Sequence, residues 1–440
     1  MSQLIVRPGK PLRGIGSVPG DKSISHRALL LTALADGVSQ IKGFLPCGDC
    51  LATLSCLQAL GIEIETHDAT TLAVMGRGRY GLQAPRSPLD CGRSGTTMRL
   101  MAGILAGQPF TSTLTGGEQL LRRPMQRIAE PLRRMGADIE TTDGHAPLII
   151  RGHRRRGHPR RGQPLHGCHH ILPIASAQVK SALLLAGLYA DGPTTIHQPG
   201  PARDHTERML AAMEAAIQTD GLAVTLSPTL SLSPLPINIP GDISSAAFPL
   251  VAAALVSDSE ITIESVGVNP TRTGLLDVLL AMGASIRLTH ERQQGHEPVA
   301  DVTTQTSKLK GAEIGGDTVV RMIDEFPVLA VAATQAHGTT IVRNAAELRI
   351  KETDRIAAIV GELRKLGASI APLQDGFIVD GPTTLHGAVV DSHGDHRMAL
   401  ALAVAGLVAD GQVVVENVEC IADSFPGFID LMGSLGADYD

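Results

Sequence analysis

The chain repeats one pattern of helix and strand six times, and this repeat limits the folds that it can adopt. In each copy an apolar, Ala/Leu-rich segment ends at a polar turn and is followed by a β-rich segment. The apolar segments cover residues 26–37, 96–107, 180–192, 247–259, 326–338 and 396–411. This alternation predicts an α/β (α+β) protein in which helices pack on sheets. Because the apolar helices have little polar face, we expect them to be buried in their domains.

A second helix closes most copies with a Leu/Met-Gly-Ala/Ile sequence. It occurs at residues 60–62, 135–137, 282–284, 366–368 and 435–437, and Asp220-Gly221 replaces it in the third copy. Gly just past a helix end commonly takes the left-handed conformation before the chain continues into a strand. Each of these glycines is therefore predicted to end a helix.

The six copies form two groups of three. Pro19-Gly20-Asp21-Lys22-Ser23 opens the first copy, and Pro240-Gly241-Asp242-Ile243-Ser244 opens the fourth. The last copy stops after residue 437 without its final strands, which residues 4–18 could supply. We therefore predict two similar domains, residues 21–239 and residues 1–20 plus 240–440, joined by two chain crossings that form a hinge.

The charge and composition argue against nucleic acid and membranes as partners. The net charge is −6, and with Trp 0, Tyr 3 and Phe 7 the chain offers few rings on which bases could stack. The longest apolar run, residues 398–409, is too short to span a bilayer. Because the first residues lack a signal-peptide pattern and the 6 cysteines are scattered, we expect a reduced, cytoplasmic protein.

Residues 151–161 are rich in arginine. A solvated hairpin loop is the favoured interpretation, and an RNA-binding patch is the alternative. An RNA-binding protein would lose salt-sensitive binding when this loop is deleted, whereas an enzyme would keep most of its activity.

The start of the first copy has the features of an anion site. Pro19-Gly20 indicates a turn, Ser23 is placed to cap the helix that follows, and Lys22 and Arg27 supply positive charge. A helix N-terminus offers free backbone N–H groups and the positive end of the helix dipole, which favour a bound phosphate. Further cations stand at helix starts or in turns leading into helices: Arg123, Arg203, Lys351, Arg355 and Arg397. Together they predict a ligand with more than one phosphate or carboxylate.

More specific expectations follow for three places in the sequence. Pro124 suits the first turn of a helix that follows Arg123. Lys351 and Arg355 lie four residues apart on a predicted helix, where like charges repel unless an anion binds between them. Asp324 stands at the start of an apolar helix and could accept a proton from a substrate hydroxyl.

Two cysteine-containing sequences could suggest metal or redox chemistry: Cys47-Gly48-Asp49-Cys50 and Cys168-His169-His170. Neither has a second ligand pair at the spacing of zinc sites. We therefore interpret both as structural and predict no metal.

Ten stretches of the chain resemble the 5-enolpyruvylshikimate-3-phosphate (EPSP) synthase family of enolpyruvyl transferases. In order they are PGDKSISHR, CGRSGTTMRL, RRPM, ASAQVKSALLLAGL, RDHTERML, PGDISSAAF, IDEFPVLAVAA, ELRIKETDR, GDHRMA and IADSFPGF. The resemblance implies two domains, each of three βαβαββ units, that close over the substrates. It implies transfer of the enolpyruvyl group of phosphoenolpyruvate (PEP) to the 5-hydroxyl of shikimate 3-phosphate, with release of phosphate, in the shikimate pathway to aromatic amino acids. It implies no metal or organic cofactor, and we expect a monomer whose partners are these two small substrates.

The functional residues of the family can be carried over to matching positions of this chain. Those implied to bind shikimate 3-phosphate are Lys22, Ser23, Arg27, Ser176, Gln178, Arg203, Asp324 and Lys351. Those implied to bind PEP are Lys22, Gly95, Arg123, Gln178, Arg355 and Arg397. The resemblance implies three catalytic residues: Lys22, Asp324 as acceptor of the hydroxyl proton, and Glu352 as the acid that protonates the PEP methylene carbon.

The chain departs from the family pattern at Arg93, where Asn is frequent, at Ala177, which replaces a serine, and at Asp423, where one class has a PEP-binding Lys. We assign no PEP contact to Asp423. The alternative activity is that of UDP-N-acetylglucosamine enolpyruvyl transferase. Glu118 occupies the position of the reactive cysteine of that enzyme, which argues against this alternative.

Overall fold

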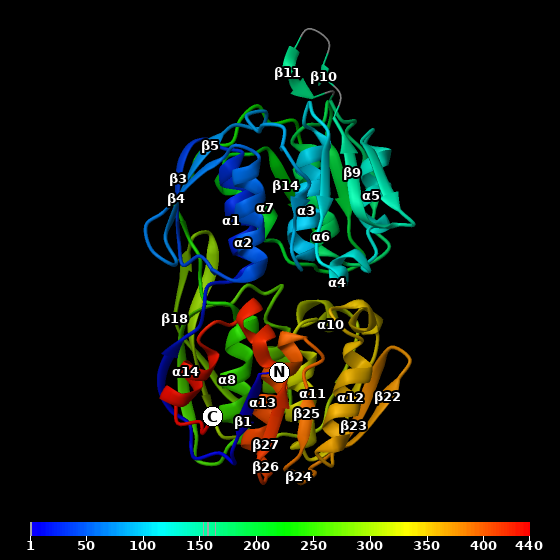
Figure 1. Cartoon of the computed structure of the whole chain (residues 1–440). Coiled ribbons are helices and arrows are strands. Elements are labelled where there is room, and N and C mark those ends of the chain that lie inside the picture. The colour runs from blue at the N-terminus through cyan, green and yellow to red at the C-terminus, as the bar shows by residue number, and fades with distance from the viewer. Residues whose placement is uncertain (1, 153, 156–157, 163) are drawn as a thin grey trace. The chain divides into compact units, whose positions relative to one another are not determined.

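The computed structural model describes residues 2–152, 154–155, 158–162 and 164–440 (Figure 1). The chain divides into two compact units. Unit 1 comprises Met1–Pro19 and Pro240–Asp440, and unit 2 comprises Gly20–Ile239. Each unit contains several small mixed sheets and has its own buried apolar core.

Among the residues that the structure describes, unit 2 contains three sheets of four strands and one pair, β10 (Arg154–Arg155) with β11 (His158–Gly162). In spatial order their strands are β16 (Ile237–Asn238), β3 (Asp36–Lys42), β5 (Leu72–Arg77) and β4 (Glu63–Thr66); β6 (Leu89–Asp90), β7 (Ser112–Thr115), β9 (His145–Arg151) and β8 (Asp138–Thr142); and β12 (His169–Ile171), β13 (Thr194–His197), β15 (Ala223–Leu226) and β14 (Ile217–Asp220).

The principal sheets of unit 1 are built from both ends of the chain. In spatial order their strands are β2 (Arg13–Ser17), β17 (Glu260–Gly267), β19 (Glu297–Gln305) and β18 (Ser285–Gln294); β20 (Glu313–Ile314), β21 (Gly338–Val342), β23 (Gly376–Gly381) and β22 (Ser369–Leu373); and β25 (Val389–Asp391), β27 (Val413–Glu416) and β1 (Gln3–Val6). A short parallel pair, β24 (Leu385–His386) and β26 (Ala409–Asp410), accompanies them.

The four-stranded sheets share one pairing order. An edge strand pairs in parallel with the second strand, which pairs antiparallel with the third, and the third pairs antiparallel with the fourth. In the remaining sheet β25 is parallel to β27, and β1 is antiparallel to it. The mixed α/β class expected from the repeat is therefore present.

The N-terminal segment serves two sheets rather than one. β1 joins the sheet of the last copy, as the sequence suggested, but β2 pairs in parallel with β17 of the fourth copy. The expectation that residues 4–18 complete the last copy is thus only half right. The intervening Pro8 and Pro11 separate the two strands, because proline cannot donate a hydrogen bond to a ladder.

The apolar helices are buried, as predicted. They are α1 (Lys22–Ala33), α3 (Gly95–Ala106) and α6 (Ala177–Gly187) in unit 2, and α8 (Ile243–Leu255), α11 (Phe326–Thr334) and α13 (His396–Leu407) in unit 1. Every residue of α11 and α13 is buried. Polar residues stand in the first turn of these helices or just before it, as Asp324 and Glu325 do before α11, and Ala, Leu and Val dominate the rest, so the helix starts are the places where polar groups can face a ligand.

Other helices cover the sheets and end as the glycine pattern predicts. They are α2 (Gly48–Ala59), α4 (Glu118–Leu121), α5 (Gln126–Arg134), α7 (His205–Ala212), α9 (Gly274–Ala281), α10 (Asp317–Arg321), α12 (Arg355–Lys365) and α14 (Phe428–Ser434), with 3₁₀ helices η1 (Ala346–Ile350) and η2 (Val418–Asp423). Gly61, Gly136, Gly283 and Gly367 have φ between 83° and 95° and follow α2, α5, α9 and α12. A side chain at these positions would be strained.

In the arginine-rich segment, the backbone of β10 (Arg154–Arg155) pairs antiparallel with that of β11 (His158–Gly162). A hairpin is expected for residues 151–161, and this strand pair forms part of it. Residues 153, 156 and 157 lie outside the described residues. No helix within the described residues is long and apolar enough to cross a membrane.

Candidate active site

The start of α1 is capped by Asp21. Its carboxylate accepts a hydrogen bond from the backbone N–H of Ile24 at 2.9 Å, and Ser23 is already inside the helix. The prediction that Ser23 is the cap is wrong, because an aspartate stands immediately before the first helical residue and reaches the same N–H groups. The Ser23 hydroxyl instead accepts a hydrogen bond from Arg203 at 3.2 Å.

Arg27 is buried one turn further along α1. Its Nε donates to Thr206 Oγ1 at 2.8 Å, Nη2 to Ser181 Oγ at 2.8 Å, and Nη1 to the backbone oxygen of Ser23 at 2.9 Å. Because Ser181 lies in α6 and Thr206 in α7, one guanidinium ties three helices together. Ser23, Arg27 and Arg203, all predicted to bind shikimate 3-phosphate, therefore lie in one cluster.

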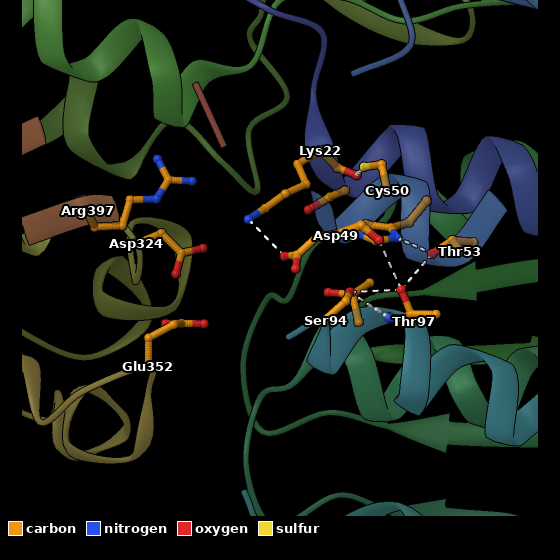
Figure 2. Close-up of polar contacts among 12 residues, drawn as sticks. Lys22, Asp49, Cys50, Thr53, Ser94, Thr97, Asp324, Glu352 and Arg397 are labelled. Atoms are coloured by element: carbon orange, nitrogen blue, oxygen red, sulfur yellow. Dashed lines mark hydrogen bonds and ion pairs between the residues drawn. The ribbon is translucent and has the colours of Figure 1, made fainter. Parts of the chain in front are cut away.

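Lys22 stands at the first position of α1 and faces α2. Its Nζ lies 3.3 Å from Oδ2 of Asp49, and both side chains are about one-fifth exposed. Behind this ion pair the Thr97 hydroxyl donates to the backbone oxygen of Asp49 at 3.3 Å and contacts Thr53 and Ser94 (Figure 2). Asp49 and the start of α2 thus hold the ammonium group of Lys22 in place.

Gly95 lies beside the side chain of Arg123. A Cβ atom at Gly95 would lie 3.0 Å from Nη1 of Arg123 and 3.3 Å from Nη1 of Arg99, so a larger residue would press on both guanidinium groups. Arg99 donates to Oε1 of Gln178 at 2.5 Å, and Gln178 donates to Thr96 Oγ1 at 2.9 Å. The predicted PEP ligands Gly95, Arg123 and Gln178 therefore lie together where α3 and α6 begin.

Two further helix starts of unit 2, those of α6 and α5, involve residues that the sequence analysis singled out. Ser176 is the cap of α6 and accepts a hydrogen bond from Val179 N at 3.4 Å. Pro124, in contrast, lies outside the helix, because α5 begins at Gln126 with Met125 as its cap. Arg123 is therefore carried by the turn between α4 and α5, not by a helical residue.

In unit 1, the carboxylate of Asp324 contacts two cations. Lys351 Nζ lies 3.2 Å from Asp324 Oδ1, and Nη1 of Arg355 lies 3.3 Å from the same oxygen. Lys351 follows η1, and α12 begins only at Arg355, so the prediction that both lie on one helix face is wrong. Their like charges are accommodated because the carboxylate of Asp324 lies between them.

Arg355 is 1% exposed and contacts two further carboxylates. Nη2 lies 2.9 Å from Oε2 of Glu352, and Nε lies 2.8 Å from Oδ2 of Asp395. Burial alone would lower the pKa of Arg355, but Asp395, Glu352 and Asp324 outweigh it and raise that pKa above its usual value. The guanidinium therefore stays charged and holds both predicted catalytic carboxylates, Asp324 and Glu352.

Arg397 lies in the first turn of α13 and is also buried. Nη1 donates to the backbone oxygen of Ser244 at 3.1 Å, and the guanidinium carbon lies 5.9 Å from the centre of the Phe248 ring. Figure 2 shows Arg397 with Asp324 and Glu352. Ser244 and Phe248 both lie in α8, so α8 and α13 together position Arg397.

Sequence reasoning assigned no role to three charged residues that contact the predicted set: Asp49, Arg99 and Asp395. Each lies four residues or fewer from a motif residue that was noted, and two stand where an acidic residue starts a helix. That position was a usable signal, but the sequence does not indicate which cation each carboxylate contacts.

The two cysteine-containing sequences lie at the starts of α2 and β12 (His169–Ile171). Within the described residues no three or more His, Cys, Asp or Glu side chains are grouped as metal ligands would be. Cys47 and Cys50 are free thiols at the start of α2, and both are buried. Cys168 is also a free thiol.

The arrangement defines an α/β enzyme for small anionic substrates. Cations lie at helix starts or in the turns before them in both units, and in unit 1 three carboxylates contact the same buried guanidinium. Such carboxylates can exchange protons with a substrate that the cations hold.

Comparison with known proteins identifies the family. The EPSP synthase (3-phosphoshikimate 1-carboxyvinyltransferase) family matches residues 6–432. The 3-phosphoshikimate 1-carboxyvinyltransferase of Brevibacillus brevis is 51% identical over 98% of this chain and 99% of its own length. That of Herpetosiphon aurantiacus is 52% identical over 96% and 97%. The structure of EPSP synthase from Acinetobacter baumannii superposes with a TM-score of 0.88 at 42% identity, covering 100% of this chain and 99% of that one. The chain belongs to the EPSP synthase family.

Proposed function

We propose that this chain transfers the enolpyruvyl group of PEP to the 5-hydroxyl of shikimate 3-phosphate and releases phosphate. The observation that carries the assignment of roles is the contact of one buried guanidinium, Arg355, with both Asp324 and Glu352. The full-length identity to 3-phosphoshikimate 1-carboxyvinyltransferases supports the choice of substrates.

Shikimate 3-phosphate is bound by cations and neutral polar groups. The cluster of Ser23, Arg27 and Arg203 supports a site for its anionic groups, because charged donors form the stronger hydrogen bonds to phosphate and carboxylate. The remaining ligands in this proposal are Lys22, Ser176, Gln178, Asp324 and Lys351. PEP is held by Arg123, Arg355 and Arg397, with Lys22 and Gln178 contacting both substrates and Gly95 leaving room beside Arg123.

The reaction proceeds by addition and elimination. The Glu352 carboxyl group donates its proton to the methylene carbon of PEP, which becomes a methyl group, and the adjacent carbon develops positive charge. The 5-hydroxyl oxygen attacks that carbon while Asp324 accepts the hydroxyl proton, which gives a tetrahedral ketal. One methyl proton then returns to the Glu352 carboxylate, and the phosphate departs with the proton that Asp324 had accepted, which restores the double bond. Lys22 and the arginines stabilise the departing phosphate.

The two units act as domains on a hinge. In this proposal each contains three βαβαββ units, and closure of the domains excludes water from the activated enol ether. The common pairing order of the four-stranded sheets supports the repeat, and the division of the chain near residues 19 and 240 supports the two crossings.

The proposal is tested by phosphate release. Purified protein mixed with PEP and shikimate 3-phosphate should release phosphate, and UDP-N-acetylglucosamine should not replace shikimate 3-phosphate. Arg123→Ala should raise the KM for PEP about 30-fold, since a hydrogen bond to a charged group contributes about 2 kcal/mol. Arg122→Ala is the matched control, because the neighbouring Arg122 is 75% exposed and pairs with Glu118 on the surface. Release of phosphate from PEP with UDP-N-acetylglucosamine as acceptor, but not with shikimate 3-phosphate, would contradict the assignment.

A further inference from the structure

One buried carboxylate, Asp395, contacts both predicted PEP-binding arginines of unit 1. Oδ2 of Asp395 accepts a hydrogen bond from Arg355 Nε at 2.8 Å, and Oδ1 lies 3.3 Å from Nη2 of Arg355. Oδ1 also accepts a hydrogen bond from the backbone N–H of Arg397 at 2.9 Å. Asp395 is the cap of α13 and is 0% exposed. Its two oxygens thus join the first residue of α12 to the first turn of α13.

The two edges of the Arg355 guanidinium are in different surroundings. One edge faces Asp395, whose side chain is 0% exposed. The other edge contacts Asp324 and Glu352, whose side chains are 18% and 25% exposed. An incoming anion can therefore displace or join Asp324 and Glu352, while the bonds to Asp395 persist.

We propose that Asp395 is a positioning residue, which fixes Arg355 and the start of α13 so that Arg355 and Arg397 are in place before PEP arrives. The inference rests on the proposed function, because it assigns Asp395 to the PEP site of that reaction. Asp395 touches neither substrate. It acts by removing the conformational freedom of a long arginine side chain, a cost that otherwise falls on binding.

Unit 1 contains a control carboxylate away from these arginines. The side chain of Asp301, in β19, is 14% exposed; its Oδ1 accepts a hydrogen bond from Ser265 N at 2.8 Å, and its Oδ2 lies 2.8 Å from Nδ1 of His290. Ser265 lies in β17 and His290 in β18, and none of the predicted substrate ligands lies in these three strands. Loss of charge at Asp301 should therefore affect stability more than PEP binding.

The test compares Asp395→Asn, Asp395→Ser and Asp301→Asn. Asn and Ser both retain a cap for the Arg397 N–H, but neither carries a charge for Arg355. For both Asp395 variants the KM for PEP should rise about 30-fold or more, while the KM for shikimate 3-phosphate changes less than about threefold, because small displacements of a binding group have large effects. Asp301→Asn should lower the melting temperature and leave the KM for PEP within about threefold of wild type.

The proposal is overturned if folded Asp395 variants keep the wild-type KM for PEP, or if Asp301→Asn raises it equally. Wild-type protein that releases no phosphate would instead reject the proposed function. Should the Asp395 variants not fold, the wild-type protein decides the question through 15N relaxation of the Arg355 Nε–H group, assigned with Arg355→Lys. An immobile group in the substrate-free protein is expected, and a mobile one would overturn the proposal.

Discussion

Arg27 of unit 2 and Arg355 of unit 1, both predicted to bind substrate, are held by different chemistry. Arg27 of unit 2 donates to the hydroxyls of Ser181 and Thr206 and to a backbone oxygen. Arg355 of unit 1 donates to carboxylates of Asp324, Glu352 and Asp395. Hydroxyl partners orient a guanidinium without cancelling its charge, whereas carboxylates balance the charge and can also carry protons. In the proposed reaction this difference fits substrate binding by Arg27 and, at Arg355, substrate binding beside the carboxylates that transfer protons.

The largest effect should come from removing a proton donor of unit 1. Glu352→Gln keeps the size of the side chain but cannot supply the proton, so kcat should fall about 10³-fold. The KM for shikimate 3-phosphate should stay within about threefold, as measured by steady-state phosphate release. Glu313→Gln, at an exposed site paired with Arg343, should leave both parameters unchanged. A change confined to KM would show that Glu352 binds rather than protonates.

The same comparison predicts unequal losses of stability. Arg355→Ala leaves the buried Asp395 carboxylate without its cation, which should lower the free energy of unfolding by about 3–5 kcal/mol. Arg27→Ala should cost about 1–2 kcal/mol, because the Ser181 and Thr206 hydroxyls, 2.7 Å apart, can bond to each other. Urea midpoints of the two variants measure the difference. Equal midpoints would mean that the partners of the two arginines do not differ in energetic importance.

Acid should destabilise unit 2 through a buried histidine. Burial, followed by the charges of Lys22 and Arg27, lowers the pKa of His26 from 6.5 to about 3. The unfolded chain therefore binds a proton between these pH values that the folded protein does not, so stability is present above pH 6.5 and is lost as the pH falls. Between pH 7.5 and pH 5 this group alone should remove about 2 kcal/mol. His26→Gln should abolish that part of the pH dependence in urea unfolding; an unchanged slope would refute it.

The smallest effect concerns a neutral cap in unit 2. Ser176→Ala removes the hydroxyl that caps α6 and should cost about 1 kcal/mol of stability. As a proposed ligand of shikimate 3-phosphate, Ser176 should also change the KM for that substrate about threefold. Ser94→Ala is the control, since Ser94 caps α3 through Thr97 N at 3.1 Å and is not a predicted ligand. If both variants shift this KM alike, the effect is one of helix capping.

Sequence reasoning succeeded where the cause is local. The glycines after α2, α5, α9 and α12 have the left-handed conformation that their position predicts, and the apolar helices are buried. It failed where two local signals compete. Both Asp21 and Ser23 can cap α1, and Lys351 and Arg355 have helical spacing although the helix begins only at Arg355.

The sequence by itself determined the α/β class, the family and the residues to examine, because hydrophobic periodicity, turn residues and motifs act over a few neighbouring positions. Only the tertiary structure decided the partners. Asp395 lies 40 residues from Arg355, and Gln178 lies 79 residues from Arg99, and no periodic signal connects such positions. Which carboxylate lies beside which arginine depends on how the buried helices pack, since the packing sets where their first turns meet.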